Sequence, residues 1–446
     1  MSRRRLPSHL QLSIDALDGD GHGVAAFGAR KVRVKAGLPG EEINGRVVGR
    51  RKGAVLTVAE AVTSPSSDRV APACAFYPRC GGCSAQHVTP ERQIEHKQNQ
   101  LLDALARNQV SYDQLRAPVL GPQVGYRRKA RLGVRLLHDQ MLVGFRESFG
   151  GRIVKMDHCV ALAAPFNDLI QPLSKMLGSL SIPAAIPQLE TAVGDDSAAL
   201  VLRHLEPLTA GDARILGEFQ ERRGVRVFTQ SAGYDTVQAL SSPERDHYLH
   251  YGLLEHGLDF EFAVTDFVQV NAHINAALVR SVVAGLQLEP GDQAVDLFCG
   301  IGNFSLPLAR QGARVTGFEF AAPSIERARH NARRNGLAAM TDFQVADLHA
   351  ETASLSLPAI TAAVLDPPRS GAGPQLANWL VPSLQKIAYV SCNPVTFAKD
   401  AALLVANGFD LAEVGIYDMF PNTAHVETLG MFVKRAGSQQ RGDLGG

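Results

Sequence analysis

Three reactive or acidic side chains each follow an apolar, strand-like run in the last third of the chain. Glu319 ends VTGFE, Asp366 follows AAVL, and Cys392 follows KIAYVS. Because the carboxyl ends of parallel strands meet at one edge of a sheet, we expect a thiol and two carboxylates to meet there. A thiolate is a nucleophile, and a carboxylate beside it can move a proton. A lone cysteine is more often core packing, but the shared position at strand ends favours catalysis by Cys392.

A glycine-rich turn precedes these positions and indicates a nucleotide-like ligand. The apolar run from Ala294 to Phe298 leads into CGIGN, where glycines allow a ligand to approach the backbone. Glu319, at the next strand end, is placed to accept hydrogen bonds from ribose hydroxyls. The turn is not GxxxxGK[ST], which excludes a P-loop. NAD remains possible, but D-x-F-x-G-x-G resembles the S-adenosylmethionine turn of methyltransferases. We rank Cys299, inside this turn, as packing.

The Asp-Pro-Pro sequence at the end of the fourth strand limits which chemical group can be the methyl acceptor. Two prolines fix a rigid turn beside Asp366, which in this architecture faces the methyl donor. Methyltransferases that act on exocyclic amines carry an aromatic residue after the prolines, whereas this chain has Arg369 there. Uracil C5 is a poor nucleophile until a thiolate adds at C6, which is a use for Cys392. A base must then remove the C5 proton, and DMFPNTAHVET supplies His425 and Glu427.

Four segments of the chain together resemble a known enzyme family. DLFCGIGNFSLPLA, LDPPRSGAG, YVSCNP and DMFPNTAHVET are similar to segments of the bacterial RNA uracil-C5 methyltransferases, and the resemblance runs through essentially the whole chain. It implies that Cys392 is the nucleophile and Glu427 the base. It also implies a set of contacts to the donor, S-adenosylmethionine: Gln269, Phe298, Asn303, Glu319, Asp347 and Asp366. For Asp347, a helix N-cap is the alternative role.

A group of cysteines lies upstream, in CAFYPRCGGC, and DHCVA adds a fourth. This spacing is typical of a zinc site or an iron–sulfur cluster, and the spacing alone leaves both open. The resemblance implies a [4Fe–4S] cluster, because the ribosomal-RNA branch of the family carries one at this spacing. The expected ligands are Cys74, Cys80, Cys83 and Cys159. Methyl transfer requires no electron transfer, so we expect the cluster to be structural and to face the RNA.

The pattern of strands and helices predicts three domains. Short β-like runs between Leu10 and Val62 predict a small β-barrel over residues 1–65, which resembles a TRAM (OB-like) RNA-binding domain. Residues 66–265 mix both patterns, and we expect a central α+β domain with the iron–sulfur cluster and an RNA-binding surface. Residues 266–446 alternate strands with helices. This predicts an α/β Rossmann-like class I methyltransferase domain, with helices on both faces of a parallel sheet.

The distribution of charge suggests a polyanionic partner. The formal net charge is +1, but residues 1–60 hold eleven Lys or Arg against six acids, and residues 121–155 hold eight against two. The barrel segment offers candidate phosphate contacts, namely Arg46, Arg50, Arg51 and Lys52. Since barrel and cluster occur together, the resemblance implies 23S ribosomal RNA as the partner, with methylation of the uracil 1939 type.

Composition excludes a membrane protein and leaves several functions open. The chain has 446 residues, enough for two or three domains, but no run of about 18 apolar residues that could span a bilayer. No apolar segment of the signal-peptide kind follows the basic N-terminus, so we expect a cytoplasmic protein. We also expect it to be a monomer. The alternatives are methylation of another uridine in rRNA or tRNA, methylation of cytosine C5, and RNA binding without catalysis. Cytosine-C5 enzymes usually carry Pro-Cys where this chain has Asp366-Pro367-Pro368.

Overall fold

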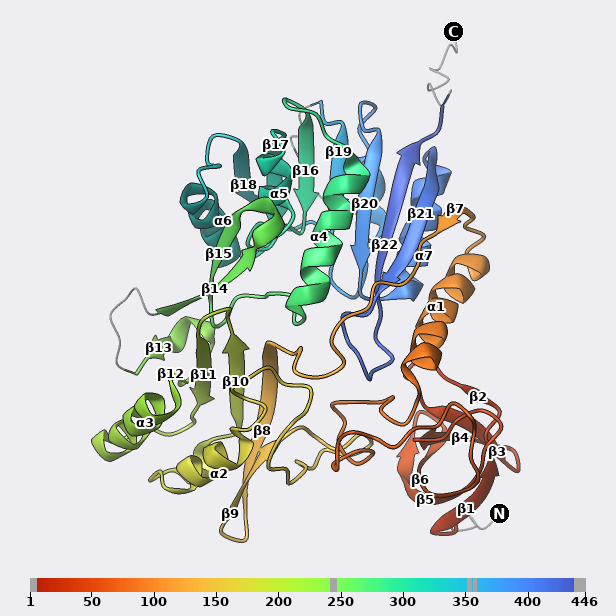
Figure 1. The fold of residues 1–446 in the computed structure, drawn as a ribbon, viewed down its shortest axis with the longest axis vertical. Coiled ribbons are helices and arrows are strands. Elements are labelled where there is room, and N and C mark those ends of the chain that lie inside the picture. Colours follow the sequence, from red (N-terminus) through yellow and green to blue (C-terminus); the bar gives the residue numbers. More distant parts are fainter. Residues whose placement is uncertain (1–5, 241–246, 351–354, 356–358, 437–446) are drawn as a thin grey trace.

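The computed structural model describes residues 6–240, 247–350, 355 and 359–436. Figure 1 shows a small barrel, a central sheet with two helices, and a larger layered domain above both. No helix in these ranges is long and apolar enough to cross a membrane. The larger domain holds the strand ends on which the chemistry was predicted, and the other two parts lie below that edge (Figure 1).

The N-terminal strands form a six-stranded sheet that curls into the small barrel (Figure 1). Alternate residues point inward in β1, so Leu10 and Leu12 are buried between exposed neighbours, and Val32 and Val34 of β4 are also buried. The short strands predicted between residues 10 and 62 are therefore present. Their order is β1 (His9–Ser13), β5 (Glu42–Arg51), β6 (Ala54–Ser64), β4 (Arg30–Lys35), β3 (Gly23–Phe27) and β2 (Ala16–Leu17).

The central part is a second six-stranded sheet with two helices packed on one face. α2 (Ile170–Gly178) and α3 (Ala210–Arg223) share one apolar core with the sheet. A capping box between Thr209 and Asp212 begins α3, and Gly224, with a φ of 62°, ends it. The strand order is β13 (Val237–Ala239), β12 (Val225–Gln230), β11 (Ala198–Arg203), β10 (Gln188–Val193), β8 (Lys129–Leu137) and β9 (Gln140–Gly144).

The C-terminal part is an eight-stranded sheet between two helical layers. α4 (Ala272–Leu286), α5 (Ser305–Arg310) and α6 (Ala322–Arg334) cover one face, and α1 (Pro90–Arg107) and α7 (Pro394–Ala406) cover the other. The strand order is β18 (Thr341–Val345), β17 (Arg314–Glu319), β16 (Gln293–Leu297), β19 (Ala362–Leu365), β20 (Lys386–Ser391), β22 (Glu427–Lys434), β21 (Phe409–Tyr417) and β7 (Tyr112–Leu115). The predicted parallel sheet is confirmed for β16 to β20.

β22 runs antiparallel to both neighbours, which the prediction of a parallel sheet did not include. Only residues 418–426 connect β21 to β22, and so short a loop cannot hold the crossover that a parallel strand would need. Because β22 runs in reverse, its first residues lie at the edge where β20 ends, and Ser391 pairs with Thr428. This register brings Glu427 to the same edge as Cys392.

Two segments upstream of residue 266 pack into the core of the C-terminal sheet. β7 pairs with β21, and α1 contributes Leu101 to the core that contains α7. The hairpin of β14 (Tyr248–Leu253) and β15 (Leu258–Ala263) contributes Phe260 and Phe262 to the core on the opposite face. The three-domain division stays a prediction, but residues 90–115 and 248–263 complete the layers of the C-terminal sheet.

Candidate active site

The turn after β16 has backbone conformations that favour glycine. Gly300 has a φ of +53° and Gly302 a φ of +93°. The backbone N–H of Gly300 donates to the Glu319 carboxylate at 3.3 Å, and the N–H of Ala321 donates to its other oxygen at 3.0 Å. Glu319, at the end of β17, therefore faces the turn and can accept further hydrogen bonds from a ligand.

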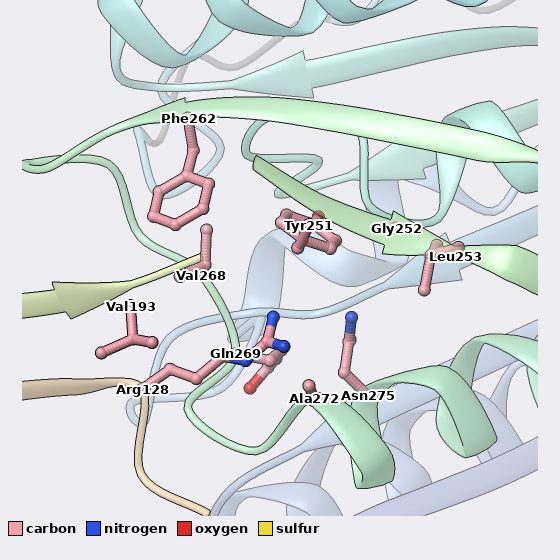
Figure 2. Close-up of a pocket in the computed structure, with 10 residues that line it drawn as sticks. All are labelled: Arg128, Val193, Tyr251, Gly252, Leu253, Phe262, Val268, Gln269, Ala272 and Asn275. Carbon is pink, nitrogen blue, oxygen red and sulfur yellow. The ribbon is translucent and has the colours of Figure 1, made fainter. Parts of the chain in front are cut away.

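Asn303 forms a hydrogen-bonded group with Asn275 and Tyr251. Its Oδ1 accepts from Asn275 Nδ2 and from the Tyr251 hydroxyl, both at 3.0 Å, and its Nδ2 donates to Asn275 Oδ1 at 2.9 Å. Figure 2 shows Tyr251, Asn275 and Gln269 around a small pocket between the β14–β15 hairpin and the start of α4. The sequence prediction missed Tyr251 and Asn275, because neither is near the glycine turn in the sequence.

Gln269 and Asp366 meet at the sheet edge. Gln269 Nε2 donates to Asp366 Oδ2 at 3.4 Å. Loss of hydration raises the pKa of Asp366 to about 7, and the hydrogen bond from Gln269 acts in the opposite direction. A cationic ligand beside Asp366 would favour its ionised form. This carboxyl can therefore hold or release a proton near neutral pH.

Phe298 and Asp347 lie around the other side of the glycine turn. Phe298 has a φ of +67°, and its ring centroid is 5.4 Å from that of His349 and 6.2 Å from that of Trp379. Asp347 Oδ1 accepts from the backbone N–H of His349 at 3.0 Å, which closes a local turn. The described residues that follow Asp347 form a turn and not a helix, so the N-cap role is not observed, and the role of Asp347 toward the donor stays a prediction.

Cys392 and Glu427 lie next to each other at the ends of paired strands. Burial, together with the nearby charges of Glu427 and Asp366, raises the pKa of the Cys392 thiol to about 11, and Arg369 acts in the opposite direction. The Glu427 side chain is buried, with 2% of the residue exposed. Burial and the nearby charge of Asp366 raise the pKa of Glu427 well above its ordinary value. The site thus holds a thiol and two carboxyls that strongly influence one another's ionisation.

Cys392 lines a cleft of about 730 Å³ where the barrel, the central sheet and the C-terminal domain meet. The loop before β22 forms one wall with Phe420, Thr423, Ala424 and His425. Cationic side chains contribute to the remaining lining: Lys35, Arg127, Arg131, Arg146 and Arg369. The cleft is large and mainly positive, so it can receive a segment of a flexible polyanion. His425 is among the lining residues, whereas Glu427 is buried and is not among them.

The predicted phosphate contacts of the barrel lie outside this cleft. Arg50, Arg51 and Lys52 are exposed at the end of β5 and the turn that follows. Arg46 pairs with Glu60 at 2.5 Å and lines a second groove, of about 870 Å³, beside the barrel. The structure therefore does not bring these four side chains to Cys392.

The four predicted ligand cysteines line one cavity. Cys74, Cys80, Cys83 and Cys159 surround it, and the N–H of Gly82 donates to Cys80 Sγ at 3.4 Å. In the described residues, one group of three or more potential metal ligands has donor atoms that all lie within 4.8 Å of one another, and that group contains none of these cysteines. No three of the four sulfurs therefore lie within 4.8 Å of one another. Cys299 is buried in the methyltransferase core, apart from this group.

Two further side chains at the donor edge were missed by the sequence prediction. Asp296 is fully buried; its Oδ2 accepts from the Ser305 hydroxyl at 2.5 Å, and its Oδ1 has no hydrogen-bond partner among the described residues. Burial raises its pKa to about 7. The signal for Asp296 was present, since it is the first residue of the D-x-F-x-G-x-G pattern. Phe267 is 73% exposed two positions before Gln269, and its sequence context gives no sign of that exposure.

The parallel sheet with its glycine turn and acidic strand ends defines the class as an S-adenosylmethionine-dependent methyltransferase of class I fold. Residues 248–436 match the family described as tRNA (Uracil-5-)-methyltransferase. The 23S rRNA (uracil(1939)-C(5))-methyltransferase RlmD of Alkalilimnicola ehrlichii is 41% identical over 97% of this chain and 99% of its own. The protein of that name from Hahella chejuensis is 39% identical over 97% and 100%. This chain belongs to the family of RlmD-type RNA uracil-C5 methyltransferases.

A solved structure supports the same fold over nearly the whole chain. The tRNA (uracil-54, C5)-methyltransferase of Pyrococcus abyssi, in complex with S-adenosyl-L-homocysteine, superposes with a TM-score of 0.73. The match covers 95% of this chain and 100% of that one, at 24% sequence identity. The prediction of a class I methyltransferase fold is confirmed.

Proposed function

We propose that the protein transfers the methyl group of S-adenosylmethionine to C5 of a uracil in 23S ribosomal RNA, of the uracil 1939 type. The names of relatives that align over nearly their full length support this substrate. The register of β20 and β22 carries the mechanism, because it sets Cys392 beside Glu427 at the edge where the glycine turn lies. Arg369, in place of an aromatic residue after the prolines, argues against an exocyclic amine as acceptor.

Cys392 is the nucleophile in this proposal. Its thiol must first lose a proton, because the thiolate is the reactive form and the pKa is raised to about 11. Asp366, with a pKa of about 7, is a nearby group that can accept that proton. The sulfur then bonds to C6 of the ring, and the C5–C6 π electrons form an enolate. When bound, S-adenosylmethionine supplies the sulfonium methyl group that C5 takes up, leaving S-adenosylhomocysteine.

Glu427 is the base that completes the reaction. It removes the proton from the methylated C5; those electrons restore the C5–C6 double bond and expel the Cys392 thiolate. Its raised pKa makes it a strong base once it is ionised, and its burial keeps water from competing. The donor is held by Gln269, Phe298, Asn303, Glu319, Asp347 and Asp366 in this proposal. Glu319 has free acceptor capacity for ribose hydroxyls.

The RNA enters through the cleft that Cys392 lines. A ring must leave its stack to reach a sulfur inside a cleft, so the substrate is a looped or flexible segment. The cationic lining supplies phosphate contacts near the reacting base, and Arg50, Arg51 and Lys52 of the TRAM-like barrel supply contacts farther along the strand. The three-domain division, a monomeric state and a cytoplasmic location belong to the same proposal.

The four-cysteine cavity is proposed to hold a [4Fe–4S] cluster. Thiolates around one zinc ion, each about 2.3 Å from the metal, would all lie about 4 Å apart, whereas no three of these sulfurs lie mutually within 4.8 Å. An all-cysteine donor set and a cavity between the ligands suit a larger cluster. Cys74, Cys80, Cys83 and Cys159 would hold it, and it would tie the segment after the barrel to the central part of the chain.

The proposed reaction is tested with wild type, Cys392→Ala and Glu427→Gln on a 23S rRNA fragment that contains the target uracil. Wild type should methylate this RNA and not its uracil-to-cytosine variant, and Cys392→Ala should lose methyl transfer entirely. Glu427→Gln should form the sulfur–C6 bond but stall before elimination, so methylated RNA should remain covalently attached to the protein in a denaturing gel. Methyl transfer by Cys392→Ala at the wild-type rate would rule the mechanism out.

A further inference from the structure

The loop of residues 418–426 forms one wall of the reactive cleft and leads directly into Glu427. Connections between strands are ordinarily among the more mobile parts of a protein. Phe420, Thr423 and His425 of this loop line the cleft together with the cationic side chains. The position of the loop therefore decides how wide the cleft is beside Cys392.

A buried ion pair attaches the start of the loop to α1. Lys97 is 1% exposed and donates from Nζ to Asp418 Oδ1 at 2.5 Å and to the Phe420 carbonyl at 3.0 Å. The backbone N–H of Asp418 donates to the Val119 carbonyl at 2.8 Å. A buried ion pair adds little to stability compared with an apolar pair of the same shape, and one attested role is to select a single arrangement. Here that arrangement is the course of the loop.

Two further side chains attach the middle of the loop. Gln93 Oε1 accepts from the backbone N–H of Asn422 at 3.0 Å, and Gln93 Nε2 donates to the Ala85 carbonyl at 3.1 Å. Ser84 donates its backbone N–H to the Asn422 carbonyl and accepts at Oγ from the N–H of Ala424, both at 3.0 Å. Asn422 itself is held in the left-handed region, with a φ of 62°. The side chains of Ser84, Gln93 and Lys97 that attach the loop all lie in residues 84–97, far from it in sequence.

We propose that Ser84, Gln93 and Lys97 are positioning residues for methyl transfer. They hold loop 418–426 as a fixed wall, so that the target ring stays between Cys392 and Glu427 through both covalent steps. This inference rests on the proposed function for the identity of the ring. The contacts of Ser84 also connect the segment after Cys83 to the loop beside the reacting edge, because Ser84 directly follows that cysteine in the sequence.

The first test is Gln93→Ala, with Asn99→Ala as the matched control on an exposed position of the same helix. The rate at saturating RNA and donor should fall about 10- to 100-fold in Gln93→Ala, because misplacement by about 1 Å costs that much. The dissociation constant for S-adenosylmethionine should stay within twofold of wild type. Amide hydrogen exchange, read by mass spectrometry, should accelerate in residues 418–426, and Asn99→Ala should change neither readout.

Lys97→Met alone would leave Asp418 buried without its partner and could prevent folding, so the second test uses Ser84. Ser84→Ala removes the hydroxyl that accepts from the Ala424 N–H and should lower the rate. Ser84→Thr keeps a hydroxyl and should return the rate to that of wild type. Faster exchange in the loop with an unchanged rate would overturn the proposal, and so would unchanged exchange in both Gln93→Ala and Ser84→Ala. An inactive wild type would instead overturn the proposed function, while the exchange measurement would still test the attachment of the loop.

Discussion

At the scale of single residues, the donor edge concentrates carboxyls that resist ionisation. Asp296, Asp366 and Glu427 all have a raised pKa, in each case chiefly because the surrounding protein removes water. Such an arrangement suits a site where a proton moves and a cationic donor binds. It also costs stability at neutral pH, because each of these groups ionises more easily in the unfolded chain.

Asp296→Asn tests this cost. The pKa of Asp296 is raised from 3.8 to about 7, so the stability that its neutral form contributes is present below about pH 4 and is lost as the pH rises through 7. Asparagine does not titrate and can still accept from the Ser305 hydroxyl. The free energy of unfolding of the variant minus that of wild type should therefore be more positive at pH 8 than at pH 4. Urea unfolding of both proteins at both pH values measures this difference. An equal difference at the two pH values would contradict the raised pKa.

At the scale of elements, the reversed strand β22 and the helix α1 matter most. β22 brings Glu427 to the edge of the sheet, and α1 supports both the loop before it and the core behind it. Leu101 of α1 is fully buried in the same core as α7. The methyltransferase layers are therefore completed by a helix that lies about 160 residues upstream of the range expected for that domain.

Leu101→Ala should accordingly destabilise the C-terminal sheet. The loss of a fully buried side chain should lower the free energy of unfolding by about 2–5 kcal/mol. Leu120→Ala, at a position that is 50% exposed, is the matched control and should change it by no more than about 0.5 kcal/mol. Denaturant unfolding followed by circular dichroism measures both. If the two variants lost the same stability, α1 would not belong to this core.

At the scale of the whole molecule, the cysteine segment joins the three parts around the cleft. Lys35 of the barrel is 1% exposed and donates to the Cys83 carbonyl at 2.5 Å, while Ser84 contacts the loop beside Cys392. Cys159 reaches the same cavity from the central part of the chain. A group bound by these cysteines would therefore lie where the barrel, the central sheet and the reactive edge meet.

The metal content of anaerobically purified protein tests the proposed cluster. Wild type should contain about four iron atoms and as many acid-labile sulfides per chain. Cys80→Ser should lose both and should unfold at a lower temperature, since a ligand of the shared site is gone. Cys299→Ala, which changes a cysteine of the methyltransferase core, should keep its iron. Stoichiometric zinc without sulfide would contradict the proposal.

The sequence by itself determined the class of fold, because its signals are local. Four features each indicate a strand end within a few residues: the glycine turn, the acids after apolar runs, Asp-Pro-Pro, and the cysteine after KIAYVS. The structure has a strand at each of these places. Short β-like runs separated by glycine likewise predicted the short strands of the barrel, and in β1 buried and exposed residues alternate as such a strand requires. The resemblance to a family added roles for these residues and not their geometry.

Only the tertiary structure decided which distant segments meet. The reversal of β22, the attachment of loop 418–426 to residues 84–97, and the joining of Asn275 and Tyr251 to Asn303 all depend on contacts between segments far apart in the chain. Local periodicity carries no information on such pairings, because the same amphipathic helix or strand can pack on several partners. The reason is physical: burial drives each apolar face to be covered, and the whole chain decides what covers it.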